Sequence, residues 1–142
     1  MNFEIKKLEQ SAVLEILTDN DSIFTPSHST VVDLHEYSQK LASHAYFNLC
    51  FVNDTLAGVI AFYKNEDAKQ IYIPYLLTRT EFQGKGVASA MLKHIVQTFH
   101  GHYTTIALEV NKTNQPALRL YSKMKFIINE DRGNKYMMVR TL

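Results

Sequence analysis

The segment 114–126, NQPALRLYSKMKF, places four residue types at a recognisable spacing, on what reads as a short helix running into a strand. Ala117 follows Asn114 by three positions, Tyr121 follows it by seven and Phe126 by twelve. Asparagine is among the best residues for capping the start of a helix. A phenol with a free pKa near about 10 keeps its proton at neutral pH and can donate it, or a hydrogen bond, to a thiolate formed in a reaction. The pattern therefore predicts a helix that presents a candidate acid, although packing in a core would also explain Tyr121.

The hexamer 83–88, QGKGVA, predicts a second functional element, between a strand pattern and a long amphipathic helix. The start of a helix exposes free N–H groups and the positive end of the peptide dipoles, which together bind phosphate. Gly84 and Gly86 would let the backbone approach a pyrophosphate closely, and Lys85 would add positive charge at the rim. A plain helix-entry turn explains the same six residues, so the hexamer by itself leaves both interpretations open.

Two other phosphate-binding motifs fit this chain poorly. A P-loop requires GxxxxGK[ST], which does not occur in the sequence. A dinucleotide fingerprint requires three small residues, and the spacing from Gly84 and Gly86 leads to Ser89, with Glu109 only loosely at the acidic position. The chain also has no room for a separate substrate domain, so we set both motifs aside.

The composition is that of one folded domain, which we expect to span residues 1–142. The chain is 46% hydrophobic and 20% charged, and no run approaches the roughly 18 apolar residues of a membrane span. The first ten residues lack the apolar stretch of a signal peptide. The single cysteine, Cys50, excludes an internal disulfide and lies in an apolar run, so we expect a core residue and a cytoplasmic protein.

The net charge of +1 makes nucleic acid an unexpected partner, but the charges are unevenly distributed. Residues 1–45 carry three lysines and seven carboxylates, whereas residues 79–142 carry ten basic and four acidic residues. This asymmetry would suit a polyanionic cofactor held by the rear of the chain and a cationic acceptor drawn to its front. Six histidines, including the His100-x-His102 pair, form no metal-binding pattern, and we expect no metal.

Hydrophobic periodicity predicts the elements that must position these residues. Strands are expected at 3–6, 46–52, 56–63, 70–78, 103–110, 125–129 and 135–140. Helices are expected at 11–18, 30–45, 86–100 and 114–124, with Thr30 as the cap of the second helix and Val31 facing inward. Residues 19–30 are expected to form a loop. Pro74 removes a backbone donor inside its strand, which predicts a bulge, an edge or a loss of pairing there.

Taken together, the chain resembles the GNAT superfamily of N-acetyltransferases over nearly all of its length. The family's cofactor turn, [RQ]-x-x-G-x-[GA], is matched by Gln83, Gly86 and Ala88. Its later segment, N-x-x-A-x-x-x-Y followed by a glycine-phenylalanine pair, is matched by Asn114, Ala117, Tyr121 and Phe126. Lys125 stands where that glycine is usual, which we expect to alter the corner between helix and strand and not to affect cofactor binding.

The resemblance implies a fold and a cofactor. The fold is a single α/β domain with a twisted, mostly antiparallel mixed sheet of six to seven strands, a central splayed parallel pair (70–78 and 103–110) and about four flanking helices. The co-substrate is acetyl-CoA. The residues that the resemblance places against it are Leu76, Leu77, Thr78, Gln83, Gly84, Lys85, Gly86, Val87, Ala88, Ser89, Asn114, Ala117 and Tyr121.

The resemblance also implies an activity, the transfer of an acetyl group to the amine of a small molecule. Tyr121 would protonate the leaving thiolate, and an unpaired N–H near Thr78 would hold the developing oxyanion. Glu109, at the end of the second splayed strand, is the candidate base, although it could instead orient backbone groups or pair with Lys112. Tyr72, Tyr75 and the histidines of the front half are further candidates. A monomer or homodimer without a nucleic-acid or membrane partner is expected.

Two other functions remain open at this point. One is a protein of this fold that binds an acyl-CoA as a sensor or interaction module without turnover. The other is a protein or peptide N-acetyltransferase, for which residues 18–45 would form an open groove in place of a closed pocket. Acidic residues in that region, beside Tyr37, point to a cationic amine; they are Asp19, Asp21, Asp33 and Glu36.

Overall fold

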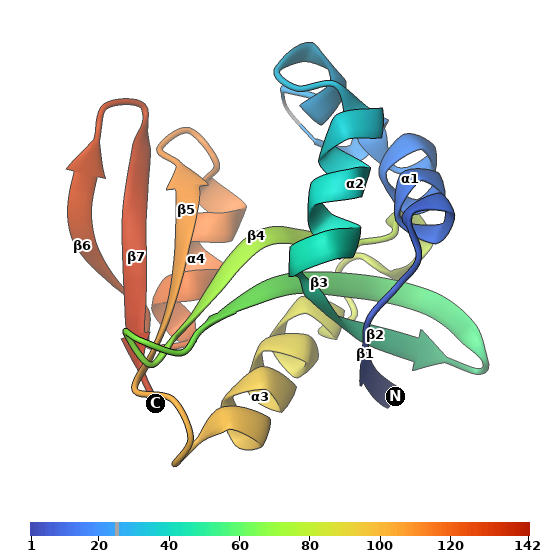
Figure 1. Cartoon of the computed structure of the whole chain (residues 1–142). Helices are drawn as coiled ribbons and strands as arrows, with labels where there is room; N and C mark the ends of the chain where they lie inside the picture. Colours follow the sequence, from blue (N-terminus) through green and yellow to red (C-terminus); the bar gives the residue numbers. More distant parts are fainter. Residues whose placement is uncertain (25) are drawn as a thin grey trace.

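The computed structural model describes residues 1–24 and 26–142 and forms a single α/β domain around one seven-stranded sheet (Figure 1). The strand order is β1-β2-β3-β4-β5-β7-β6. Only β4 and β5 run parallel, and every other neighbouring pair is antiparallel. The strands are β1 (Asn2–Lys6), β2 (Tyr46–Val52), β3 (Thr55–Asn65), β4 (Gln70–Thr78), β5 (Thr105–Asn111), β6 (Ile127–Arg132) and β7 (Lys135–Thr141). The expected fold class is confirmed.

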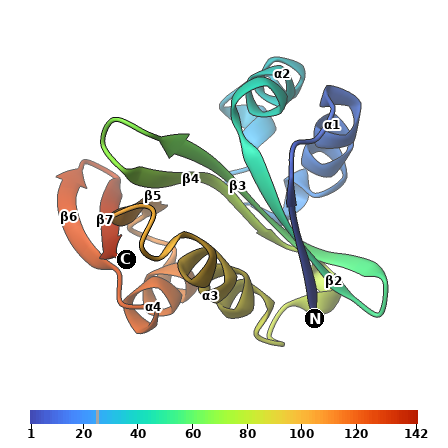
Figure 2. The ribbon, with the colours of Figure 1, turned by 60° about the horizontal axis from the view of Figure 1, so that its bottom comes forward.

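Four α-helices cover the two faces of this sheet. Helices α1 (Gln10–Asp19) and α2 (Leu34–His44) lie on one face, and α3 (Val87–Phe99) and α4 (Gln115–Lys123) lie on the other (Figure 2). Three short 3-10 turns complete the described structure: η1 (Asp21–Ile23), η2 (His28–Thr30) and η3 (Thr80–Phe82). The core is accordingly divided into two clusters, one under α1 and α2 and one under α3 and α4.

The β2–β3 hairpin forms where the sequence predicts it. Asn53 and Asp54 both adopt positive φ, as a two-residue hairpin turn of the right twist requires. Gly58 on β3 then lies directly beneath α3, because a Cβ at this position would come within 2.7 Å of Met91 Cε and 2.9 Å of Val87 Cγ1. The absence of a side chain at Gly58 therefore lets the first turns of α3 pack close to the sheet.

The expected start of the second helix at Thr30 is wrong. Helix α2 begins at Leu34, and Asp33 is its N-cap, with its carboxylate accepting a hydrogen bond from the Glu36 N–H at 3.1 Å. Val31, expected to face inward, is 71% exposed. Thr30 instead ends η2, and its hydroxyl donates to the Ser27 carbonyl. Threonine and aspartate are both good N-caps. The helix begins after Asp33, because the Asp33 side chain accepts a hydrogen bond from a free N–H in the first helical turn.

Two strands near the C-terminus also begin later than expected. β5 begins at Thr105 and not at residue 103, and β6 begins at Ile127 and not at Lys125. Lys125 takes φ of +71°, the left-handed conformation that a glycine would adopt most easily. The Phe126 N–H donates to the Tyr121 carbonyl at 2.9 Å, which closes the end of α4. The residue at the corner between α4 and β6 is therefore a lysine with left-handed backbone angles.

Within the part of the chain that the structure describes, every helix is too short or too polar to cross a lipid bilayer.

Candidate active site

The parallel pairing of β4 and β5 stops halfway along the two strands. Residues 70–73 of β4 pair with residues 105–108 of β5, and the last pair is Ile73 with Leu108. Beyond it, residues 74–78 and 109–111 are not paired with each other, and the strands diverge (Figure 1). Pro74 is the first residue past the last pair, so the predicted loss of pairing at this proline is confirmed. We call the opening between these unpaired segments the seam.

A bulge at the same place reverses which face of the sheet the β4 side chains occupy. The pairs Ala61–Tyr75 and Tyr63–Tyr72 show that a step of two residues along β3 corresponds to a step of three along β4. Ile73 therefore packs in the cluster under α3 and α4, whereas Tyr75 packs in the cluster under α1 and α2. Tyr72 lies on the same side as Tyr75, because its ring stacks on Tyr63 with centroids 6.5 Å apart.

The bulge leaves two backbone N–H groups of β4 directed at the seam. The Arg79 N–H donates to the Ala57 carbonyl of β3 at 2.9 Å. Because backbone groups of a strand alternate between its two neighbours, the N–H groups of Leu76 and Thr78 point away from β3 and toward the seam. The backbone of Leu77 faces β3, and its side chain is buried under α1 and α2. The Thr78 carbonyl accepts a hydrogen bond from Gln83 Nε2 at 3.2 Å.

The glycine turn forms an open cradle at the start of α3. Gly84 and Gly86 have φ of +76° and +79°, and a Cβ at either position would meet nothing within 4 Å. Gly86 is the N-cap of α3, and no side chain caps this helix end. Lys85 is exposed, with its ammonium 5.8 Å from the Phe82 ring centroid. Val87 is buried, and Ala88 and Ser89 are half-buried. The backbone N–H groups of this first helical turn have no partner inside the helix, so they are available to an anion.

Helix α4 begins at its N-cap Asn114 and carries Ala117 and Tyr121 on the α3–α4 side of the sheet. The Asn114 side chain accepts from the Ala117 N–H at 3.2 Å, so the predicted cap is present. Tyr121 is 8% exposed and packs in the same cluster as Leu108 and Val110 of β5. Burial raises the pKa of the Tyr121 phenol to about 12. The hydroxyl therefore carries its proton throughout the physiological range.

Glu109 lies on the opposite face of β5 from Tyr121. Its two neighbours, Leu108 and Val110, point into the cluster that contains Tyr121, so the alternation of the strand turns Glu109 toward the other side. There Glu109 Oε1 accepts from the Tyr72 hydroxyl at 3.4 Å, and Glu109 Oε2 lies 3.3 Å from Arg132 Nη1. Burial and the adjacent Glu109 carboxylate together raise the pKa of Tyr72 to about 12.

The expected pairing of Glu109 with Lys112 is absent among the described residues. Lys112 instead forms an ion pair with Asp131 at 2.6 Å. Arg132, on the β6–β7 hairpin, is the partner of Glu109, and it also contacts Glu130 at 3.0 Å. No sequence pattern predicted a role for Arg132, because its approach to Glu109 depends on the register of β7 with β5 and β6.

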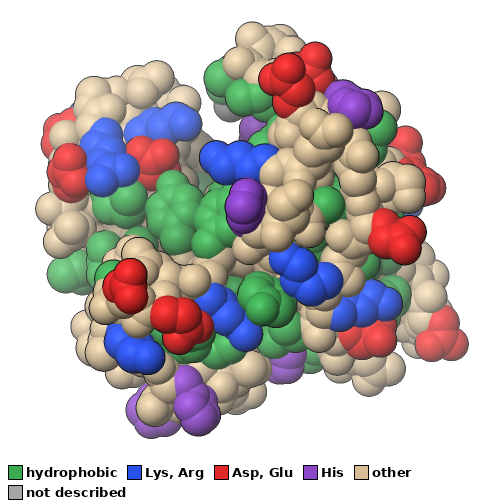
Figure 3. Space-filling view, in the orientation of Figure 1, with side chains coloured by type: hydrophobic (Ala, Val, Ile, Leu, Met, Phe, Trp, Pro, Cys, Tyr) green, Lys and Arg blue, Asp and Glu red, His purple; other side chains and the backbone are tan. Residues whose placement is uncertain are grey.

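A cluster of aromatic side chains lies between Tyr72 and α2, on the same face of the sheet as Glu109. The His28 ring lies 4.3 Å from Phe24 and 5.5 Å from Tyr75, measured between centroids, and 6.2 Å from Tyr37. The Tyr37 hydroxyl donates to the Pro74 carbonyl at 3.4 Å, at the mouth of the seam. The Tyr75 hydroxyl is buried, and no described residue hydrogen-bonds to it. Figure 3 shows the corresponding hollow between α2 and strands β5–β7, floored by side chains of the hydrophobic class.

Burial is the main cause of the pKa shifts in this aromatic cluster. It raises the pKa of Tyr37 and of Tyr75 well above the usual range for a phenol. It lowers the pKa of His28, and the charge of Lys135 lowers it further, while Asp21 opposes both effects. His28 is therefore a neutral aromatic group at physiological pH.

The four acidic residues expected around a cationic amine do not gather at the seam. Asp33 caps α2, and Glu36 is exposed on that helix. Asp21 accepts hydrogen bonds from the backbone and hydroxyl of Ser29, which lower its pKa. Asp19 lines a different cavity, between α1 and strands β2 and β3. Of the predicted acceptor residues in this region, Tyr37 alone contacts β4 at the seam. Among residues 1–24 and 26–142, no group of side chains is arranged to hold a metal ion.

Comparisons with known proteins agree with this geometry. The family model described as "Acetyltransferase (GNAT) family" matches residues 11–126. The PaiA N-acetyltransferase of Thermoplasma acidophilum, solved with coenzyme A, superposes with a TM-score of 0.77 at 16% identity, over 100% of both chains. Naa50 of Arabidopsis thaliana, bound to the bisubstrate analogue CoA-Ac-MVNAL, gives 0.74 at 19% identity, also over 100% of both.

A third solved structure is the ribosomal-protein-S18-alanine N-acetyltransferase of Escherichia coli. It superposes with a TM-score of 0.74 at 16% identity, covering 99% of this chain and 94% of that one. At these identities the likeness concerns the fold. No curated protein matches the chain by sequence.

Proposed function

Because the chain belongs to the GNAT acetyltransferase family, whose members use acetyl-CoA, we propose that it acetylates the amine of a small molecule. One observation carries this proposal: the seam is open, with Tyr121 on one face of the sheet and the Glu109–Tyr72 pair on the other. A thioester held on the α3–α4 face and an amine held on the α2 face would meet through this opening.

The residues present fit the co-substrate. The free N–H groups at the start of α3 and the open space above Gly84 and Gly86 suit the diphosphate. The N–H groups of Leu76 and Thr78 suit the amide-bearing arm and the thioester carbonyl. Lys85 adds charge at the rim of the cradle, and Ala117 leaves space beside α4 for the arm.

In the proposed reaction the amine nitrogen bonds to the thioester carbonyl carbon, and the carbon–sulfur bond breaks. The seam-facing N–H groups stabilise the negative charge that develops on the carbonyl oxygen. Tyr121 donates to the departing sulfur. A phenol with a pKa of about 12 is a weaker acid than a free thiol, so its main contribution is a strong hydrogen bond to a thiolate whose own pKa burial also raises.

Glu109 is proposed to accept the proton that the amine releases. Arg132 lies 3.3 Å from this carboxylate and Tyr72 donates to it, so both contacts hold the Glu109 side chain in position before the amine arrives. The stacked rings of Tyr63 and Tyr72, both half-buried, provide surface for the body of an amine and for cation–π contact with its charged form.

A thiol-release assay with acetyl-CoA and a panel of amines tests the proposal, with mass spectrometry to identify the acetylated product. The panel should include polyamines, amino sugars, amino acids and arylalkylamines. Isothermal titration should first show that acetyl-CoA binds. A flat titration at millimolar acetyl-CoA would exclude the proposal, and binding without thiol release across the panel would favour a sensor or interaction module.

A peptide amine is a second candidate acceptor. Two of the structural neighbours are described as acting on, or bound to, peptide-like acceptors, and the hollow in Figure 3 is open at its rim. Adding short peptides with varied first residues to the same assay separates the two acceptor classes. Turnover of peptides, with small amines inactive, would replace the small-molecule proposal with this one.

A further inference from the structure

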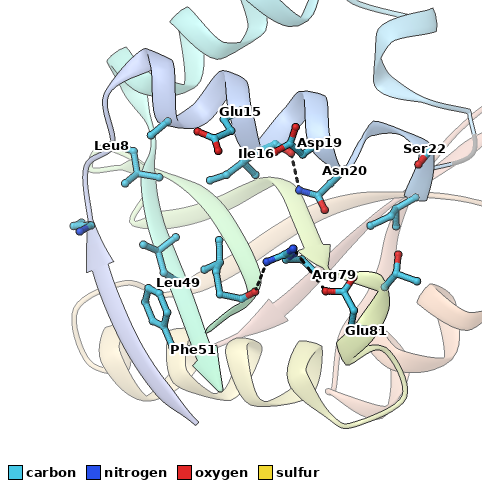
Figure 4. Close-up of a pocket in the computed structure, with 15 residues that line it drawn as sticks. Leu8, Glu15, Ile16, Asp19, Asn20, Ser22, Leu49, Phe51, Arg79 and Glu81 are labelled. Atoms are coloured by element: carbon cyan, nitrogen blue, oxygen red, sulfur yellow. Dashed lines mark hydrogen bonds and ion pairs between the residues drawn. The ribbon is translucent and has the colours of Figure 1, made fainter. Parts of the chain in front are cut away.

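A cavity of about 520 Å³ lies between α1, the end of β2, the start of β3 and residues 79–81, which follow β4 (Figure 4). Leu49 and Phe51 of β2 and Leu56 of β3 line its inner side, and Ile16 of α1 faces them. Its volume is in the range of small-molecule sites, roughly 300–1,000 Å³. Neither Tyr121 nor Glu109 lines it, so it is separate from the site described above.

Two carboxylates without cationic partners stand at the α1 side of this cavity. Glu15 and Asp19 are one helical turn apart and both are exposed. No described residue forms an ion pair or hydrogen bond with either carboxylate. The guanidinium of Arg79, on the opposite wall, is occupied: it donates to the Leu56 carbonyl at 3.1 Å and pairs with Glu81 at 3.6 Å.

The position of these carboxylates is locally unfavourable for α1. Like charges at positions i and i+4 repel each other on a helix. Asp19 is also the last residue of α1, where the helix dipole favours a cation, and the last turn holds no basic residue. Local rules of this kind are most often broken at functional sites. A bound cation would relieve both penalties.

We propose that this cavity is a second ligand site, which binds a small organic cation with an apolar body. The apolar body would pack on Leu49, Phe51 and Leu56, and the ammonium would lie between Glu15 and Asp19. An anionic ligand fits this cavity less well. Two basic residues line it, Lys6 and Arg79, and among the described residues Arg79 is already paired with Glu81, which leaves Lys6 alone to balance an anion. The apolar wall excludes a fully hydrated inorganic ion as the preferred occupant.

An NMR titration of the whole chain with phenethylammonium tests this site without acetyl-CoA. The backbone amides of Leu56 and Thr80 should shift in a saturable manner, because both residues line the cavity. The double variant Glu15→Gln/Asp19→Asn should bind the probe roughly fivefold more weakly at these amides, as expected for two exposed ion pairs. Without the probe, this variant should melt at or above the wild-type temperature.

The matched control is Glu4→Gln/Glu36→Gln, which removes the same charge from exposed positions that do not line the cavity. It should bind the probe as tightly as the wild type. 2-Phenylethanol, which has the same apolar body without the charge, should bind more weakly than phenethylammonium. Three results would overturn the proposal: no saturable shift at Leu56 and Thr80, unchanged affinity in the Glu15/Asp19 variant, or equal binding of the alcohol.

Discussion

Ile73 of β4 lies opposite Leu108 of β5, and this is the last pair of the only parallel ladder in the sheet. The next residue on β4 is Pro74, which has no N–H to continue the ladder. The next residue on β5 is Glu109, which faces away from the cluster that contains Tyr121. The end of the ladder therefore coincides with the opening of the seam and with the separation of the two candidate catalytic groups onto opposite faces.

Replacing Tyr121 with phenylalanine tests the proposed hydrogen bond to the departing sulfur. We expect turnover to fall by roughly 10²–10³-fold, the usual cost of removing one donor to a developing charge, with the acetyl-CoA dissociation constant changed little. Steady-state thiol release and isothermal titration measure the two quantities. Tyr103→Phe, two residues before the start of β5, is the control and should leave turnover intact. Unchanged turnover in the Tyr121 variant would reduce that residue to a packing role.

Replacing Glu109 with glutamine tests the proposed base. The Glu109–Arg132 pair is partly exposed, so its loss should lower the free energy of unfolding by no more than about 1 kcal/mol. A fall of tenfold or more in kcat/KM would then report on chemistry. Glu130→Gln is the matched control, because it also removes a carboxylate partner of Arg132 but on an exposed edge strand. Equal losses in both variants would assign the effect to Arg132 and not to a base.

Local sequence patterns predicted most of the fold. The bounds of β2 and β4 agree with the predicted ranges 46–52 and 70–78, because strand alternation and hairpin turns are encoded over short distances. The start of α2 was mispredicted because Thr30 and Asp33 are both good caps and the sequence does not say which reaches a free N–H. Choosing between two local signals of similar strength required the tertiary structure.

In the candidate site too, some features follow from local sequence patterns and others depend on tertiary structure. The glycine turn and the cap at Asn114 follow from residue types at fixed local spacing. The Glu109–Arg132 contact depends on the register of β7 with β5 and β6, and the placement of Tyr72 beside Glu109 depends on the parallel register of β4 with β5. Contacts of this kind join residues far apart in the chain, and no short pattern reports them.

Gly86→Ala tests the phosphate cradle. Alanine at φ of +79° costs roughly 1–2 kcal/mol in backbone strain, and the new Cβ would point into the open space proposed for the diphosphate. Gly133→Ala is a close control, with φ of +78° and equally open surroundings on the β6–β7 turn. Both variants should lose similar stability in urea denaturation, and only Gly86→Ala should weaken acetyl-CoA binding in isothermal titration. Equal acetyl-CoA affinity in the two variants would argue against the cradle.

Lys125→Gly should stabilise the protein. Lys125 holds φ of +71° at the end of α4, where glycine has no Cβ penalty. The gain is limited by the greater freedom of glycine in the unfolded chain, so we expect an increase of about 0.5–1 kcal/mol in the free energy of unfolding. Arg119→Gly, at an exposed position inside α4, should instead destabilise the protein by about 1 kcal/mol. A loss of stability at position 125 would show that the lysine side chain makes a compensating contact.

Stability at alkaline pH should report the burial of Tyr121. The folded-state pKa of about 12 lies above the value of about 10 in an unfolded chain, so the buried phenol favours unfolding once the unfolded chain ionises. Stability from this group is intact below pH 10 and is lost as the pH rises toward 12. At pH 11 the loss should be about 1.4 kcal/mol, and Tyr121→Phe should lack this part of the decline. Urea denaturation of both proteins at pH 8, 10 and 11 measures the difference. A gap between them that does not change with pH would show that the phenol is ionised as easily in the folded protein as in the unfolded chain.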